Sequence, residues 1–343
     1  MESLRRSRDW RELLSFRRIS AIYVWIGIIV LFSIWVPETF LTTTTLVALM
    51  ADNAITTIVA LGLVVALATG VFDLSVGAVL GFSAVLSAHL MVEQNLPPVV
   101  AVAISLAFGF VVGVVNGVII VKYKVDSFIA TLAMSSVLIA LQEWLTGNQQ
   151  IIGLSSGFKR ISTIKPLGVP IAFIYMLLLA FVLWYVLQFT PLGRYLYATG
   201  GSREIARLAG LRPDRWVALS LIVSSLVAAF AGIVVLARVS GAGPTLGGTY
   251  LLPVFAAAFL GATQITPGRF NVWGTVVAVF VLATGSKGLQ LAGFEPWVDK
   301  MFYGVVLVLS VILAGSTRLR QRRTAMPQND AKNSRQDSPR VGG

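Results

Sequence analysis

The sequence predicts an all-α polytopic membrane protein of about ten transmembrane helices, built as two inverted halves that each contain a broken helix, with both termini cytoplasmic. Hydrophobic residues make up 56% of the 343 residues, charged residues only 12%, and the mean hydropathy is +0.82. A soluble domain usually carries about 25% charged residues, so a bilayer is the expected solvent. The apolar residues also form long runs, and the charges gather at the ends and between the runs.

Ten apolar segments follow one another along the chain, several of them short for a span of about 20 residues. They are residues 21–36, 43–68, 75–92, 98–121, 127–146, 169–189, 216–237, 249–263, 271–287 and 297–315. A basic N-terminus, 1–20, precedes this membrane domain of 21–315. The polar tail, 316–343, has no periodicity, and we expect it to be disordered.

The distribution of basic residues predicts the topology. With the N-terminus inside and ten spans, the cytoplasmic segments are 1–20, 122–126, 190–215, 264–270 and 316–343. Only six of the 27 Lys and Arg residues then lie outside, namely Lys159, Arg160, Lys165, Arg238, Lys287 and Lys300. Basic loops stay cytoplasmic, so both termini are expected inside. The segment 147–168 is placed outside although it carries three of these six.

Two apolar runs are interrupted in a similar way. One break is ATGVFDLSVGA, 68–78, and the other is VSGAGPTLGGTY, 239–250. Both put the polar backbone of Gly, Ser or Thr near membrane depth, which is tolerated only inside protein or beside a wet cavity. Breaks at corresponding places in two halves indicate an inverted repeat around a central pathway.

Polar residues on the apolar segments are candidates for the lining of that pathway. Asp73 is the most conspicuous, and it is read either as a pathway residue or as the N-cap of the helix that starts at LSVG, with the cap favoured. A cap beside a break could also face a cavity. Taken singly, the other polar residues are more typical of helix packing. The full candidate set is Asn53, Phe72, Asp73, Ser75, Asn116 and Thr131.

The longest useful polar interruption is 190–215, which carries five arginines and must emerge from the bilayer. Within it, SREIARLAG reads as a short helix with Ile205 and Leu208 on one side and arginines on the other. Gly210 followed by Pro213 is a stop signal. The apolar side has no reason to be exposed unless a partner covers it. The residues assigned to this contact are Gly201, Glu204, Ile205, Ala206, Arg207, Leu208 and Gly210.

Several function classes are excluded by composition. The absence of cysteine removes disulfides, Cys-ligated zinc and thiolate catalysis, and a single His argues against a histidine metal site. No Lys follows a Gly, so there is no Gly-Lys-Ser/Thr phosphate loop, and we expect no cofactor in this chain. The net charge of +12 is spread over ends and loops, which does not favour a nucleic-acid partner.

Three motifs in order resemble those of ABC-transporter permeases of the ribose, xylose and arabinose type, over roughly residues 45–315. FDLSVGAVLGFSA is similar to that family's Asp-Leu-Ser-Val-Gly segment. GVVNGVIIVKYKVDSFIATLAM is similar to its Asn-Gly stretch and Phe-Ile-x-Thr-Leu run. TPLGRYLYATGGSREIARLAGL is similar to its loop with Gly-Arg, Tyr-Ala, Gly-Gly and Ala-x-x-x-Gly.

The resemblance implies a permease subunit of an ATP-driven importer in the bacterial inner membrane. Its implied partners are a separate ABC ATPase that grips the 201–212 helix, a periplasmic or lipid-anchored sugar-binding protein, and a second permease copy, identical or paralogous. The substrate implied is a monosaccharide.

Alternatives remain open. Permeases for branched-chain amino acids or nucleosides resemble this fold too. An ion-driven secondary transporter would need acids deep in its spans, for which Asp73 and Glu143 are the candidates. A membrane-embedded enzyme is disfavoured, because the chain has no zinc motif, no Gly-x-Ser-x-Gly and no clustered carboxylates.

Overall fold

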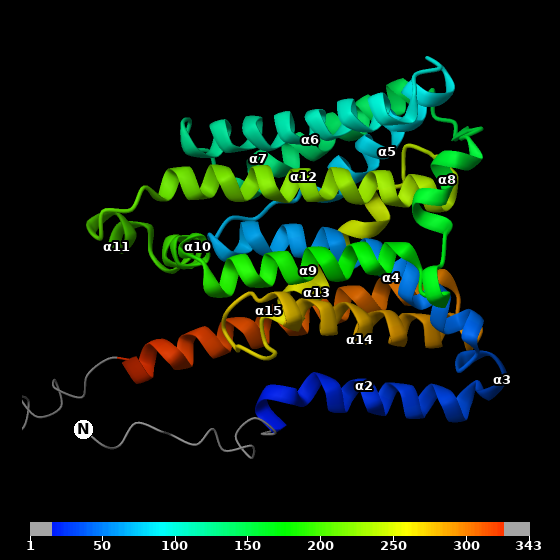
Figure 1. Ribbon diagram of the computed structural model, residues 1–343. Coiled ribbons are helices and arrows are strands. Elements are labelled where there is room, and N and C mark those ends of the chain that lie inside the picture. Colours follow the sequence, from blue (N-terminus) through cyan, green and yellow to red (C-terminus); the bar gives the residue numbers. More distant parts are fainter. Residues whose placement is uncertain (1–15, 326–343) are drawn as a thin grey trace, which may run out of the picture.

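The computed structural model describes the backbone of residues 16–325 and the side chains of residues 22–315, and it is almost entirely helical (Figure 1). Among these residues, seven helices are long and apolar enough to cross a membrane. They are α4 (Thr43–Ala68), α6 (Pro98–Val121), α7 (Ser127–Thr146), α9 (Ile171–Phe189), α12 (Pro213–Val239), α14 (Val272–Leu291) and α15 (Pro296–Ala325). The prediction of a helical membrane protein is therefore confirmed at the level of seven candidate spans.

Three further apolar helices are shorter than a full span in their apolar part. They are α2 (Phe16–Trp35), α5 (Val76–Val92) and α13 (Gly248–Gly261). The seven long and three short helices coincide with the ten predicted segments. The bounds of α4, α6 and α7 equal the predicted ones, because hydropathy falls sharply at polar residues or Pro on each side. α15 continues to Ala325, past the predicted start of the tail at 316, and residues 1–15 and 326–343 lie outside the described residues.

Short elements occupy the two ends of the bundle. One end carries α10 (Pro191–Gly201) and α11 (Arg203–Leu208). The opposite end carries α3 (Pro37–Phe40), α8 (Ser156–Thr163) and the 3-10 turn η1 (Pro166–Gly168) (Figure 1). Two strands were not expected. β1 (Ile151–Ile152) and β2 (Gly241–Ala242) pair antiparallel, and they tie the predicted outer segment 147–168 to the second break.

α4 and α12 pack against each other at the centre of the bundle and run in opposite directions (Figure 1). Arg238 Nε, in the last turn of α12, donates to Asp52 Oδ1 of α4 over 2.6 Å. At the other end, the hydroxyls of Thr69 and Ser220 lie 3.0 Å apart. The largest hydrophobic cluster is built mainly on these two helices, with α5, α13 and α14 around them.

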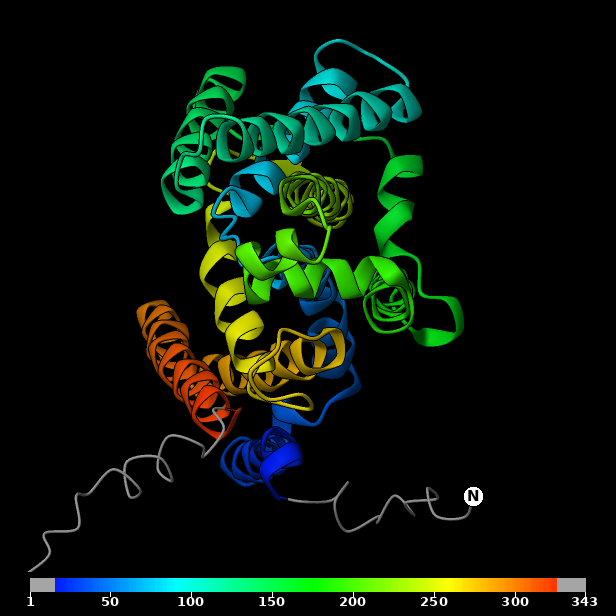
Figure 2. The same ribbon diagram turned by 90° about the vertical axis from the view of Figure 1, so that its left-hand side faces the viewer.

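The remaining contacts repeat in two sets. α6 packs on α12 and α5 packs on α7, while α14 packs on α4 and α13 packs on α15. Seen from the α11 end, α6 and α7 lie on one side of the central pair and α14 and α15 on the other (Figure 2). The helices α4, α5, α6 and α7 therefore correspond in order to α12, α13, α14 and α15, and each of these contacts in one set has a corresponding contact in the other.

Candidate functional site

The segment predicted to contact a partner forms α11, which is capped at both ends. Ser202 has an extended backbone, and its hydroxyl accepts a hydrogen bond from Ile205 N over 3.3 Å. Gly210 has φ +79°, Gly210 N donates to Arg207 O over 2.9 Å, and Leu211 N donates to Ala206 O over 3.0 Å. These two bonds are the Schellman ending for which glycine is favoured. Local sequence therefore fixes this six-residue helix.

One face of α11 is apolar and open. Leu208 is 85% exposed and Ile205 is 68% exposed, whereas Ala206 is buried against the protein. Glu204 is exposed in the first turn of α11, and Gly201, the last residue of α10, has open space where a Cβ would stand. An exposed apolar pair on a helix that projects from the end of the bundle is a typical contact surface.

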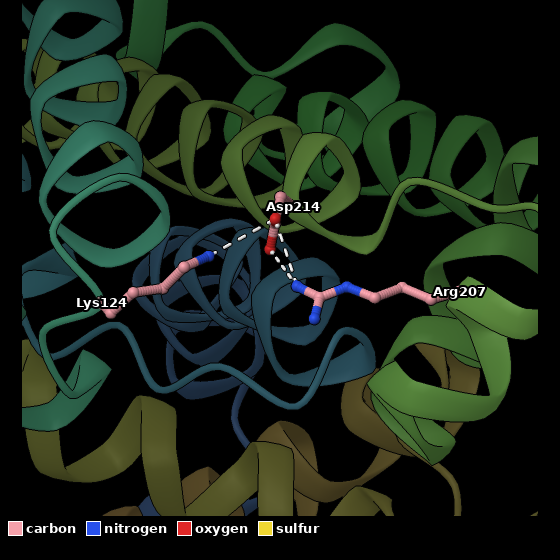
Figure 3. Close-up of polar contacts among 3 residues, drawn as sticks. All are labelled: Lys124, Arg207 and Asp214. Atoms are coloured by element: carbon pink, nitrogen blue, oxygen red, sulfur yellow. Dashed lines mark hydrogen bonds and ion pairs between the residues drawn. The ribbon is translucent and has the colours of Figure 1, made fainter.

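α11 is linked to the loop between α6 and α7 by ion pairs on a single carboxylate (Figure 3). Arg207 Nη2 lies 3.3 Å from Asp214 Oδ2, and Lys124 Nζ lies 3.4 Å from the same oxygen. All three side chains are more than a third exposed. Exposed ion pairs contribute about 0–1 kcal/mol. The triad therefore joins α11, the start of α12 and the α6–α7 loop without adding much stability.

α10, which lies across the end of the bundle, touches the first break directly (Figure 2). A Cβ on Gly200 would collide with the backbone of Ala68 and lie 3.0 Å from Gly70 N, so only glycine allows this approach. Ser127, the first residue of α7, accepts a hydrogen bond from Phe72 N over 3.3 Å. α10, which precedes α11, and α7, whose preceding loop shares Asp214 with α11, thus both contact the break between α4 and α5.

The loop 264–270 is attached to α10 through Tyr197. The Arg269 guanidinium lies 3.4 Å from the Tyr197 ring centroid, and the Tyr197 hydroxyl donates to Phe270 O over 2.7 Å. Burial raises the pKa of the Tyr197 phenol above its ordinary value, although the charge on Arg269 acts in the opposite direction. The phenol therefore remains a neutral donor at physiological pH.

The first break gathers four of the six predicted pathway residues into one buried cluster. Asp73 Oδ1 accepts from Ser75 N over 3.1 Å and from Ser75 Oγ over 2.6 Å, and Asn116 Nδ2 donates to Ser75 Oγ over 3.0 Å. Thr131 Oγ1 accepts from Leu74 N over 3.0 Å. None of the four side chains is solvent-accessible. We call Asp73, Ser75, Asn116 and Thr131 the closed cluster.

The capping role of Asp73 differs from the expected one. α5 begins at Val76, so Ser75 rather than Asp73 is the N-cap residue, and the Ser75 side chain makes no capping bond. Asp73 does accept the Ser75 N–H, two residues ahead of it, as an Asx turn does. The carboxylate thus accepts from the backbone of the break, and it lies two residues before the N-cap position.

The other two predicted pathway residues lie elsewhere. Phe72 is 39% exposed and stacks on Phe259 of α13, with ring centroids 6.3 Å apart. Asn53 is half-buried on α4 and lines a cavity of about 340 Å³ between α4, α13, α14 and α15. We call this cavity the open pocket. Two of its residues, Thr249 and Tyr250, lie in the first turn of α13 and are the last two residues of the second break.

Sequence reasoning missed most of the open pocket, because its polar residues come singly from four helices. It also missed the close approach of Gly200 to the first break and the two ion pairs made by Asp214. The repeat itself could have indicated the pocket. Asn116 near the end of α6 and Thr131 near the start of α7 correspond in position to Gln290 near the end of α14 and Asp299 near the start of α15. Among the side chains of residues 22–315, no group of three or more His, Asp or Glu could hold a metal ion.

Comparison with known proteins agrees with this architecture. Residues 45–311 match the family described as "Branched-chain amino acid transport system / permease component". The ribose import permease protein of Bacillus subtilis (strain 168) is 34% identical, over 83% of this chain and 89% of that protein. The D-allose transport system permease protein of Escherichia coli (strain K12) is 26% identical, over 83% and 88%. The fructose import permease protein of Rhizobium meliloti is 27% identical, over 83% and 81%. No solved structure gives a significant match.

Proposed function

The chain belongs to the family of permease components of branched-chain amino acid transport systems, and on that premise we propose that it is the transmembrane permease subunit of an ATP-driven importer for a monosaccharide. The substrate class is supported by the relatives, which are named for ribose, D-allose and fructose import. The family match spans residues 45–311, which include both breaks and α11. As a multi-pass subunit it would reside in the bacterial inner membrane.

The proposed architecture is ten membrane crossings in two inverted halves, α4–α7 and α12–α15. The repeated neighbours and the antiparallel central pair support this arrangement. Both central helices also end at a residue with left-handed φ, Gly70 after α4 and Ser240 after α12. Discontinuous helices at matching places in two halves are typical of transporters with a central site.

The proposed orientation places the α11 end in the cytoplasm. The predicted cytoplasmic segments 122–126, 190–215 and 264–270 meet there through the Lys124–Asp214 and Tyr197–Phe270 contacts. α2 also begins and α15 ends at the same end (Figure 1). A basic end of this kind favours the cytoplasmic side.

The observation that carries the coupling role is the apolar, capped α11 with Leu208 and Ile205 exposed. We propose that a separate ABC ATPase binds this face, and that its movement reaches the first break through Gly200 and through Lys124. ATP can bias the permease only if the ATPase contacts its two states differently. A sugar-binding protein on the opposite end and a second permease copy complete the proposed complex.

Substitution of Leu208 tests this proposal. Leu208→Asp puts a charge on the apolar face without touching the fold, since the side chain is exposed. We expect unchanged amounts of permease in the membrane, loss of co-purifying ATPase, and uptake of radiolabelled sugar reduced by at least about tenfold, the effect of roughly 1.4 kcal/mol at an interface. Leu208→Met, which keeps the apolar volume, should transport normally.

Normal uptake by Leu208→Asp would refute the coupling role of α11. Uptake in vesicles that persists without ATP and collapses with the ion gradient would instead favour an ion-driven transporter. Gly210→Asp is a poorer probe, because a left-handed φ is strained for most side chains and the substitution could damage the helix end itself.

A further inference from the structure

The open pocket is a polar cavity that the proposed coupling role leaves unused. Its volume of about 340 Å³ lies at the lower end of the roughly 300–1,000 Å³ found for small-molecule sites. Of the residues that line it, only Leu49, Pro253 and Ala283 lack a polar side-chain atom. It lies toward the end of the bundle opposite α11, where α14 ends and α15 begins (Figure 1).

The open pocket and the closed cluster occupy matching positions in the two sets of helices. The closed cluster uses the start of α5, the end of α6 and the start of α7, and α12 supplies Ser220, which lies 3.0 Å from Thr69 at the start of the same break. The open pocket uses the start of α13, the end of α14 and the start of α15, and α4 supplies Asn53. In the first position the side chains of Asp73, Ser75 and Asn116 bond one another and are buried, although Asp73 Oδ2 and Asn116 Oδ1 have no partner among the described residues. In the second position the polar side chains surround a cavity.

The charges around the open pocket balance. Asp52 is paired with Arg238 at 2.6 Å, and the pocket contains one further cation, Lys287, and one further anion, Asp299. Asp299 Oδ1 is buried and has no hydrogen-bond donor among the described residues. A buried carboxylate oxygen without a donor is costly, so a ligand hydroxyl there would supply a missing bond.

We propose that the open pocket binds a neutral monosaccharide on its way through the permease, an inference that rests on the proposed function. Asp299 accepts hydrogen bonds from sugar hydroxyls, Lys287 and Asn53 donate to them, and the rings of Tyr250 and Tyr303 cover the C–H faces. A balanced, mostly polar lining suits an uncharged polyol. A branched-chain amino acid would need an apolar hollow for its side chain, which this lining does not provide.

The absence of cysteine makes a direct test possible in an unmodified background. Asn53→Cys and Gln290→Cys are introduced singly into the complete importer, in right-side-out vesicles, and are exposed to a membrane-impermeant methanethiosulfonate reagent. Thr131→Cys in the closed cluster is the matched control. D-ribose, D-allose and D-fructose are first screened for uptake by the wild-type complex, and the transported sugar is then used for protection.

We expect both pocket cysteines to react from outside and Thr131→Cys not to react. The transported sugar should slow the reaction about tenfold at ten times its dissociation constant, because only empty sites are labelled. Unreactive pocket cysteines, or labelling that a transported sugar does not slow, would overturn the inference while leaving the proposed function intact. If the wild-type complex takes up none of the three sugars in an ATP-dependent manner, the proposed function fails and the pocket assignment fails with it.

Discussion

The two breaks in the bundle differ in what fills them. At the first, between α4 and α5, the side chains of Asp73, Ser75, Asn116 and Thr131 are buried and bonded to one another or to the break. At the second, between α12 and α13, the corresponding helices surround a cavity of about 340 Å³. The same arrangement of helices therefore supports a closed polar cluster at the α11 end and an open pocket at the other.

This difference indicates that the two positions have separate tasks. The break that holds the closed cluster contacts Ser127 of α7 and Gly200 of α10, and the α6–α7 loop before Ser127 carries Lys124, which pairs with Asp214. The open pocket is attached to none of these. The first break thus has contacts that could transmit movement of α11, and the second has the space and polarity expected of a ligand site.

The largest effect is expected where the two breaks touch. A Cβ on Gly247, at the end of the second break, would collide with the backbone of Gly77 in α5. Because backbone cannot move aside as a side chain can, Gly247→Ala should cost about 3 kcal/mol or more. Gly248→Ala is the matched control, with open space at its Cβ. Thermal unfolding in detergent measures both, and equal stability of the two variants would mean that the breaks are not in contact.

A second substitution pair separates stability from transport. Asp73→Ala leaves Ser75 N–H and its hydroxyl without their acceptor, so we expect a loss of about 2 kcal/mol in unfolding free energy. Asp299→Ala removes a buried carboxylate oxygen that has no donor among the described residues, so the protein should lose no stability while maximal uptake falls. Asp73→Asn, which keeps an acceptor oxygen, should be milder than Asp73→Ala. The reverse pattern would contradict the assignment of the two tasks.

A smaller effect is expected at Tyr197, which joins α10 to the loop 264–270. Tyr197→Phe removes one hydrogen bond and should cost about 1 kcal/mol. The pKa of Tyr197 is raised in the folded protein, so its contribution is complete below the ordinary value of 10.0 and is lost as the pH rises through the folded pKa. Unfolding measured from neutral to strongly alkaline pH should show this loss in wild type and a weaker one in Tyr197→Phe.

The smallest stability effect is expected for the exposed ion triad. Lys124→Ala should change the unfolding free energy by less than about 1 kcal/mol. If the triad conveys movement from α11 to the first break, uptake should nevertheless fall, and high salt should reduce the difference from wild type by screening exposed charges. Lys165→Ala, a basic residue at the opposite end, is the control. Equal uptake by both variants would confine the link to Gly200.

Most of the fold could be predicted from hydropathy. The apolar run 98–121 lies between Pro97 and Lys122, and the run 127–146 begins after Asp126. The helices α6 and α7 have the same bounds. The β1–β2 pair could not be predicted, because Ile151–Ile152 and Gly241–Ala242 are two-residue segments whose pairing depends on tertiary placement. Helix α8 is short and amphipathic, and hydropathy does not distinguish it from a loop.

The proposed coupling surface was more predictable than the proposed ligand site. α11 is defined by local signals, Ser202 before it and Gly210 after it, which a sequence displays directly. The open pocket is defined by four helices that are distant in sequence, and each contributes a few polar residues to an otherwise apolar helix. Asn53 was recognised without its neighbours, because nothing local indicates that Lys287 and Asp299 lie beside the same cavity.

The two-residue ladder between β1 and β2 connects the predicted outer segment 147–168 to the second break. Ile151 pairs with Ala242 and Ile152 with Gly241, and these rungs are the hydrogen-bonded attachment of the segment 147–168 to the residues that lead into α13. A protein that binds to segment 147–168 would therefore act on the second break through these two residue pairs, without entering the bilayer. In the proposed orientation, the sugar-binding protein outside would act on the second break and the ATPase inside would act on the first.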